Sequence, residues 1–335
     1  MPELGIACLL SAVADVQAKR QRNMTTFHPR ADDNGKHRQI LKPSQPTDLG
    51  TWSDPSAIAR AVPDSTMPDL IGDVSVAAWN DAPATSEDWE LLVKGLTFSE
   101  PPMPSALGKK PAAGVVTIEP DGRVWAVAPT DGYGGYATTF PKGKLDGLSP
   151  RATAIKEAFE ESGLRVELTG YLCDIVRTTS VTRYYTARRV GGNPAAMGWE
   201  SQAVMLVPIN ELRSVTTHPN DAPIISALPH RAIIAYEWGL ASGHRVLDTL
   251  AGYFARYGEW PTEISIEIDM HDGLRDTIFT PYGWRLLNER LKVHATDTPR
   301  LEAEGGHGQK HSYDTNGPVD LRKRASEWIW NVDLT

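Results

Sequence analysis

This sequence contains very little cysteine. Among its 335 residues only Cys8 and Cys173 occur, which excludes a disulfide framework and a CxxC zinc pattern. No apolar run approaches the roughly 18–20 residues that span a bilayer. Positive charge is also outweighed, since 34 Lys and Arg face 42 Asp and Glu, for a net charge of −8. This balance argues against bulk binding of nucleic acid.

A short apolar stretch near the N-terminus, Leu4–Ala14, has the length of a signal-peptide core. No positive side chain precedes it, whereas Lys19, Arg20 and Arg22 follow it, which is the reverse of the order in secretory signals. We therefore expect a cytoplasmic protein without membrane attachment.

The chain is longer than one ordinary domain requires, since single cores typically serve roughly 100–200 residues. Residues 1–85 are expected to be largely flexible, because prolines and turn-forming polar residues interrupt residues 24–68 without a sustained period. Residues 86–239 are expected to form one domain with its core at 110–235. Residues 240–335 are expected to form a C-terminal α+β extension or small domain of unknown role.

The pattern within the expected domain predicts an α/β fold with a mixed sheet. Two strands, Gly114–Glu119 and Arg123–Ala128, flank a Pro-Asp-Gly turn, and a helix begins at Ser149-Pro150 and ends at Gly163. Further strands are expected at residues 165–172, 183–190 and 202–207, followed by a helical stretch around 221–239.

The C-terminal region shows a second pattern of helices and one strand. Helices are expected at residues 242–257, 280–291 and 320–330, a strand at 263–268, and a flexible loop at 294–318, where glycine and polar residues accumulate.

Three glutamates crowd one face of the helix that begins at Ser149. Glu157, Glu160 and Glu161 fall three and four residues apart, and like charges at this spacing repel one another. A hard divalent cation such as Mg²⁺ or Mn²⁺, which prefers carboxylate oxygens and substrate phosphates, would remove that repulsion. The alternative is an acidic helix face that is simply solvated.

The residues around these glutamates resemble the box of the Nudix hydrolase family, G-x5-E-x7-R-E-U-x-E-E-x-G-U, in which U is aliphatic. Positions of this box are matched by Gly143 (with a loop one residue shorter), Glu157, Glu160, Glu161, Gly163 and Leu164. Pro141-Lys142-Gly143 is similar to a variant seen in family members that act on dinucleoside polyphosphates. The run from Glu200 to Leu212 also resembles a later family segment, E…W-V-P-L-x-E-L.

Two box positions differ from the family pattern. The box Arg is Lys156, which keeps the charge but loses the planar guanidinium. The earlier box Glu is Leu148, and Asp146 is the nearby carboxylate.

The resemblance implies an α/β/α sandwich and a set of site residues. Metal ligands for Mg²⁺ or Mn²⁺ are expected at Gly143, Glu157, Glu160 and Glu161. Catalytic roles are expected for Lys156 and for Glu160 or Glu200, either of which could act as general base. Substrate contacts are expected from Lys142, Lys144, Arg177, Arg183 and Tyr136.

The resulting hypothesis is a metal-dependent pyrophosphohydrolase acting on a nucleoside diphosphate linked to another moiety, either a dinucleoside polyphosphate or an ADP-ribose-like compound. An alternative is a Nudix-fold sensor that binds a nucleotide with little or no hydrolysis, which the changes at Leu148 and Lys156 would permit. A homodimer, or a protein partner docked on the C-terminal region, is a further hypothesis.

Overall fold

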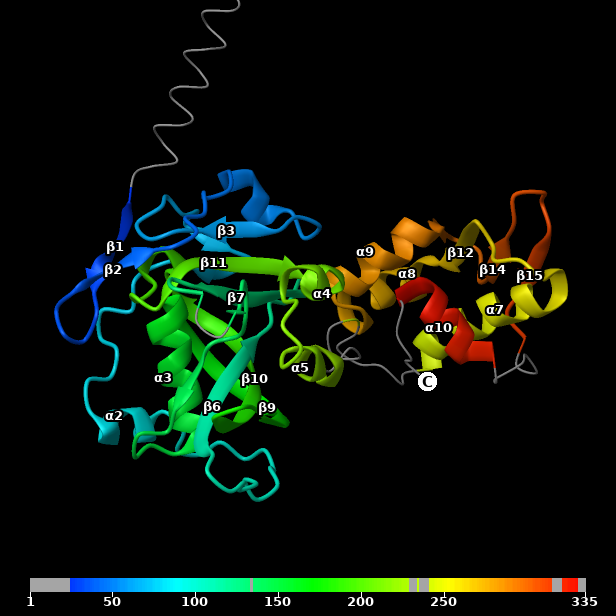
Figure 1. The fold of residues 1–335 in the computed structure, drawn as a ribbon. Helices are drawn as coiled ribbons and strands as arrows, with labels where there is room; N and C mark the ends of the chain where they lie inside the picture. Colours follow the sequence, from blue (N-terminus) through cyan, green and yellow to red (C-terminus); the bar gives the residue numbers. More distant parts are fainter. Residues whose placement is uncertain (1–24, 133–134, 229–233, 235–240, 315–320, 331–335) are drawn as a thin grey trace, which may run out of the picture.

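The structure of the chain is a computed structural model that describes residues 25–132, 135–228, 234, 241–314 and 321–330. Two sheets lie at the centre of the larger unit (Figure 1), in strand orders β8-β6-β10-β9 and β3-β11-β7. β10 runs parallel to β6 and antiparallel to β9, so the larger sheet is mixed and the predicted α/β fold is confirmed. The strands are β3 (Ala59–Ala61), β6 (Lys110–Thr117), β7 (Arg123–Pro129), β8 (Lys142–Lys144), β9 (Leu164–Val176), β10 (Ser180–Gly192) and β11 (Ser201–Pro208).

Helix α3 (Pro150–Ser162) lies against β6 and β9 and has the ends that its sequence predicts. The Ser149 side chain accepts a hydrogen bond from the backbone N–H of Ala152, which is the geometry of an N-cap. Gly163 ends the helix with φ 68°, and a Cβ there would lie 2.3 Å from the Asn193 carbonyl oxygen. Glycine is therefore required at this turn for both its conformation and its lack of a side chain.

Residues 25–85 differ from the flexible region expected at 1–85, while residues 1–24 lie outside the described part. This segment forms β1 (Thr26–Ala31), β2 (His37–Ile40), the 3₁₀ turn η1 (Leu49–Ser53), β3, β4 (Leu70–Ile71) and β5 (Val74–Ser75). β3 adds to the edge of β11, with Val204 opposite Ala61. Trp52 is 2% exposed and lies 5.9 Å from the Trp125 ring. The segment is part of the core.

Two buried arginines explain how a proline-rich polar segment is held in place. Arg123, on β7, donates hydrogen bonds to the carbonyl oxygens of Thr51, Trp52 and Asp54. Arg189, on β10, forms a buried ion pair with Glu119 at 2.6 Å and donates to the Ile71 carbonyl. These charged donors satisfy backbone carbonyls of the segment, so it packs against the sheets without a regular hydrophobic period.

Helix α2 (Ser86–Leu91) braces the start of α3. Thr85 caps α2, and Trp89 packs edge-on to Trp79 at 5.8 Å. The Glu90 carboxylate accepts hydrogen bonds from the backbone N–H and the hydroxyl of Ser149, at 2.6 and 2.9 Å. A negative charge at this end also suits the α3 dipole.

The 3₁₀ turn η3 (Pro194–Ala196) joins β10 to β11, and short elements after β11 lead to a C-terminal module: η4 (Ile209–Glu211), α4 (Leu212–Val215) and α5 (Ala222–Ala227). The module contains the sheet β13-β12-β14-β15. Its elements are α7 (Ala241–Tyr257), β12 (Glu263–Glu267), α8 (Ile268–Gly273), η5 (Leu274–Ile278), α9 (Pro281–Arg290), β13 (Lys292–Thr296), β14 (Leu301–Glu304), β15 (Lys310–Ser312) and α10 (Arg322–Trp330). The flexible loop expected at 294–318 instead supplies β14 and β15 and most of β13. Much of the helix expected around 221–239 lies outside the described residues.

The module and the larger unit meet at the turn between β6 and β7 (Figure 1). A Cβ on Gly122, whose φ is 83°, would lie 2.3 Å from the Tyr282 ring of α9. Buried residues of both units, among them Val124 and Ile209 on one side and Leu250 and Tyr282 on the other, belong to one hydrophobic cluster. The two units thus share a core.

None of the helices in the described part of the chain is long and apolar enough to cross a membrane.

Replacing Trp52 by alanine tests whether residues 25–85 belong to the core. We expect Trp52→Ala to lower the free energy of unfolding by about 3–5 kcal/mol, since it empties a buried indole site. Urea unfolding followed by fluorescence and circular dichroism measures the change. The control is Leu49→Ala, at a side chain that is 48% exposed, which should change the value by less than about 0.5 kcal/mol. Equal stability of wild type and Trp52→Ala would contradict the packing.

Candidate active site

Two of the three helix glutamates point into the domain. Glu157 and Glu161, one turn apart on α3, are 9% and 6% exposed. The described residues offer the Glu157 carboxylate no hydrogen bond or ion pair, and Glu161 accepts one weak hydrogen bond from the backbone N–H of Lys142, at 3.3 Å. Buried carboxylates usually have several donors or a cation beside them, so this pair lacks compensation.

Gly143 lies directly against this pair. It is the middle residue of β8, opposite Ala113 of β6. A Cβ at this position would lie 2.0 Å from Glu157 Oε1. Only glycine leaves room for that carboxylate, which gives a physical reason for glycine at the position matching the leading residue of the box.

Burial and mutual repulsion both oppose ionisation of the pair. Desolvation, followed by the charges of Glu161 and Glu160, raises the pKa of Glu157 to about 9. Desolvation also raises the pKa of Glu161 to about 7, although the nearby charge of Lys142 acts in the opposite direction. A cation beside the carboxylates would favour their ionised forms.

Glu160 faces outward, with a side chain that is 49% exposed, and forms an ion pair with Lys156 one turn earlier. Burial alone would lower the pKa of Lys156, but the hydrogen bond and charge of Glu160, with Glu157 and Asp146, raise it. Lys156 therefore occupies the box Arg position as a charged partner of Glu160. The three glutamates therefore lie close together on α3, but Glu157 and Glu161 point into the domain while Glu160 points outward.

Glu200 reaches the same neighbourhood from the loop before β11. The backbone N–H of Gly198 donates to the Glu160 carbonyl at 2.8 Å, and that of Thr130 donates to the Glu200 carbonyl at 2.8 Å. The side chain is exposed, yet partial desolvation, followed by the charges of Glu160 and Asp33, raises the pKa of Glu200. A carboxylate that is accessible and has a raised pKa suits proton transfer near neutral pH.

The chemistry of these donors fits Mg²⁺ or Mn²⁺. No three His, Cys, Asp or Glu side chains of the described residues are grouped as a ready-made metal cage. Mg²⁺ does not require one, because it is usually bound by one or two carboxylates together with waters and substrate phosphates. Glu157 and Glu161, with the backbone carbonyl of Gly143, would be that set. Glu160 could join it only by leaving Lys156.

Lys142 and Tyr136 lie together beside the carboxylates. The Lys142 ammonium lies 5.3 Å from the centroid of the Tyr136 ring. Tyr136 also stacks on His218 at 3.8 Å and accepts a hydrogen bond from Asn220 at 2.9 Å. His218 and Asn220 were missed in the sequence because nothing local marks them, and a contact between residue 136 and residue 218 is set only by the fold.

Lys144 and Lys156 line a different hollow, a pocket of about 130 Å³ between α2 and the start of α3. Leu148, at the position of the earlier box Glu, lies in this wall and is 9% exposed. Its side chain packs with the core instead of supplying a carboxylate. Asp146, with φ 44°, stands at the rim beside Lys156.

Arg177 and Arg183, for which substrate contacts are predicted, are both buried and paired with carboxylates. Arg177 is 7% exposed and donates to Asp221 and Tyr184, each at 2.9 Å, and to the Tyr136 hydroxyl at 2.5 Å. Arg183 is 2% exposed and binds both oxygens of Asp174 at 2.8 Å. Both charges are neutralised inside the fold, by Asp174 on β9 for Arg183 and by Asp221, which directly precedes α5, for Arg177.

Comparison with known proteins gives a family match for part of the chain. Residues 108–228 match the family model described as NUDIX domain. Solved structures resemble about a third of the chain: an ADP-ribose pyrophosphatase from Streptococcus suis is 20% identical over 36% of this chain and 92% of its own, with a TM-score of 0.30. A C. elegans Ap4A hydrolase is 17% identical over 34% and 92%, with a TM-score of 0.28. A MutT NUDIX hydrolase from Burkholderia pseudomallei is 20% identical over 36% and 98%, with a TM-score of 0.32. None of the curated proteins matches the chain.

The raised carboxyl pKa values predict how stability changes with pH. Between the ordinary value of 4.5 and the raised values, the folded chain holds protons that the unfolded chain has lost. With EDTA present, the free energy of unfolding should therefore decrease as pH rises from about 5 to about 9, and then level off. Urea unfolding across that range measures the slope.

Glu161→Gln should flatten part of this decrease, because one titrating group is removed. Glu167→Gln is the control, since the Glu167 side chain is 50% exposed on β9, and it should keep the wild-type slope. The interpretation fails if Glu161→Gln and wild type show the same pH dependence.

Proposed function

We propose that residues 108–228, which match the family model described as NUDIX domain, form a metal-dependent pyrophosphohydrolase. The proposed substrate is a nucleoside diphosphate linked to another moiety. The observation that carries the proposal is the buried pair Glu157 and Glu161 on α3, uncompensated by the described residues and facing the bare backbone of Gly143.

In this proposal, Glu157 and Glu161 bind Mg²⁺ or Mn²⁺. Such an ion neutralises charge on the phosphoryl oxygens and favours deprotonation of water. Glu157 and Glu161 would contribute carboxylate oxygens, and their ionised forms would be stabilised in return. Lys142, whose backbone N–H already orients Glu161, would place a point charge beside the phosphates.

Glu200 is the stronger candidate for the general base. Glu160 is paired with Lys156, which lowers its availability, whereas Glu200 is solvent-accessible and has a raised pKa. Glu200 would accept a proton from the water that attacks phosphorus, and Lys156 would hold Glu160 in position.

The Pro141-Lys142-Gly143 segment favours a dinucleoside polyphosphate as substrate, followed by an ADP-ribose-like compound. Cytoplasmic location is proposed on the order of charges around Leu4–Ala14. A homodimer or a protein partner of the C-terminal region stays a hypothesis, since that module uses Tyr282 to pack against the NUDIX domain itself.

A substrate screen tests the proposed activity. The full chain with Mg²⁺ or Mn²⁺ should hydrolyse at least one member of a panel of dinucleoside polyphosphates, ADP-ribose and nucleotide sugars. Glu157→Gln and Glu161→Gln should lower kcat about a hundredfold or more, because metal stabilisation of phosphoryl charge is worth several kcal/mol. Glu167→Gln is the matched control and should keep wild-type kcat. Equal turnover by Glu161→Gln and wild type would rule out its role in the site.

The general base can be assigned with two further variants. Glu200→Gln should lower kcat about a hundredfold and remove the acidic limb of its pH profile. Glu160→Gln should have a smaller effect. The reverse order would assign the base to Glu160 instead, and unchanged turnover in Glu160→Gln would leave that residue without a catalytic role.

The second candidate function, a nucleotide sensor, is favoured by Leu148, whose side chain is buried where the family pattern has a carboxylate. A sensor would bind ADP-ribose or a dinucleoside polyphosphate in the presence of EDTA and hydrolyse neither with any metal. Isothermal titration and product analysis on the same samples distinguish the two functions.

A further inference from the structure

The hairpin formed by β1 and β2 lies outside the family match, yet it is attached to the loop that carries Glu200. His28, which is fully buried, lies with Nε2 3.1 Å from the Ser201 carbonyl oxygen. The backbone N–H of Leu41 donates to the Thr130 carbonyl at 3.2 Å. These contacts join the hairpin to the start of β11 and to the end of β7.

Arg38, on β2, is held on two sides but keeps part of its guanidinium free. Its Nε donates to Asp32 Oδ2 at 2.6 Å, and its Cζ lies 5.5 Å from the ring centroid of Trp199. The side chain is 47% exposed. Neither terminal nitrogen makes a hydrogen bond to any residue that the structure describes.

Asp32 is satisfied without this arginine. Its Oδ1 accepts hydrogen bonds from the backbone N–H groups of Asn34 and Lys36, at 3.0 and 2.9 Å. The carboxylate thus fixes the hairpin turn and at the same time orients Arg38. A side chain ordered in this way loses less conformational freedom when it binds a ligand.

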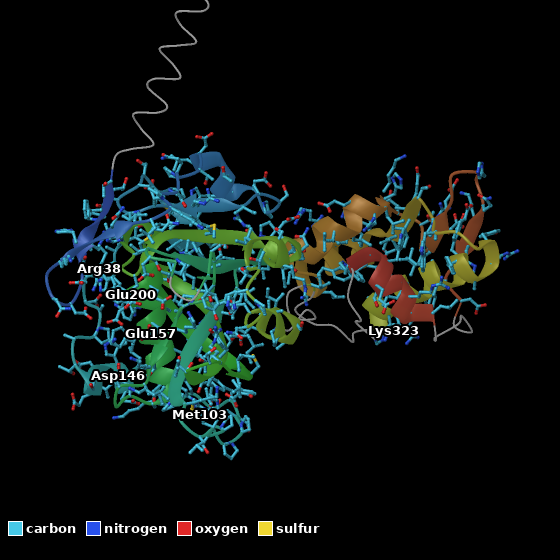
Figure 2. All side chains as sticks on the ribbon, in the orientation of Figure 1. Arg38, Met103, Asp146, Glu157, Glu200 and Lys323 are labelled. Atoms are coloured by element: carbon cyan, nitrogen blue, oxygen red, sulfur yellow. The ribbon has the colours of Figure 1, made fainter. Side chains whose placement is uncertain are left out.

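The position of Arg38 is next to the candidate active site. Trp199, under its guanidinium, is the residue before Glu200. Figure 2 shows Arg38, Glu200 and Glu157 following one another along one side of the domain. The neighbouring Asp33 is close enough for its charge to act on Glu200. A phosphate that approaches this side of the domain is repelled by the carboxylates of Asp33 and Glu200. The positive charge of Arg38 would offset that repulsion.

We propose that the terminal nitrogens of Arg38 bind a phosphate group of the substrate. A guanidinium presents two parallel N–H groups that match phosphate oxygens. The hairpin would then add a phosphate contact from outside residues 108–228. This inference rests on the proposed function, because it assigns a substrate contact at the same site.

Kinetics on the full chain test the assignment. For the panel substrate that the wild type hydrolyses with Mg²⁺, Arg38→Ala should raise KM about ten- to a hundredfold and change kcat less than about threefold. Arg38→Lys should be intermediate, because it keeps the charge and loses the fork. The control is Arg188→Ala, which removes an exposed arginine that pairs with Glu167 across β9 and β10, and should leave KM unchanged. Thermal unfolding of each variant shows whether the hairpin remains folded.

Titration with ADP separates this inference from the activity. Wild type should bind ADP in the presence of Mg²⁺, and Arg38→Ala should weaken that binding by the same factor as KM. Unchanged KM and unchanged ADP affinity in Arg38→Ala would overturn the assignment while leaving the hydrolase intact. If the wild type hydrolyses nothing on the panel, the proposed function fails, yet weaker ADP binding in Arg38→Ala still supports the contact. No ADP binding by the wild type counts against it.

Discussion

Two carboxylates that are nearly removed from water form the central constraint of this molecule. Burying Glu157 and Glu161 opposes folding unless a cation or donors compensate, and the described residues supply little of either. The surrounding structure serves to keep them there. Ser149 and Gly163 define the ends of the helix, and Gly143 leaves space beside it. A helix held so firmly presents the carboxylates at fixed positions, as a metal site requires.

The N-terminal segment is part of the same arrangement. Arg123 and Arg189 accept no hydrogen bonds and have many N–H groups, so each can satisfy several backbone carbonyls at once. They fix residues 49–75 against the sheets even though that segment lacks a regular apolar pattern. The preceding hairpin is thereby brought to the Glu200 loop, where Arg38 stacks on Trp199. A region outside residues 108–228 thus lies beside the candidate site.

The two departures from the family pattern have different consequences. Lys156 retains an ion pair with Glu160, so the charge that the box requires is still present, although without bidentate geometry. Leu148 replaces a carboxylate by core packing. The remaining donors near α3 are therefore Glu157, Glu161 and, from other positions, Glu160 and Glu200. This reduced set fits an ion whose coordination is completed by waters and substrate phosphates.

The sequence by itself determined what depends on neighbours along the chain. Helix α3, its cap at Ser149, its end at Gly163 and the spacing of its glutamates were all predicted, because capping and helical periodicity are local. Tertiary structure decided the rest. Arg177 is paired with Asp221. Residues 49–75 are held by arginines more than sixty residues away, which donate hydrogen bonds to their backbone carbonyls. Contacts of that kind depend on how distant segments pack together, which no local pattern reports.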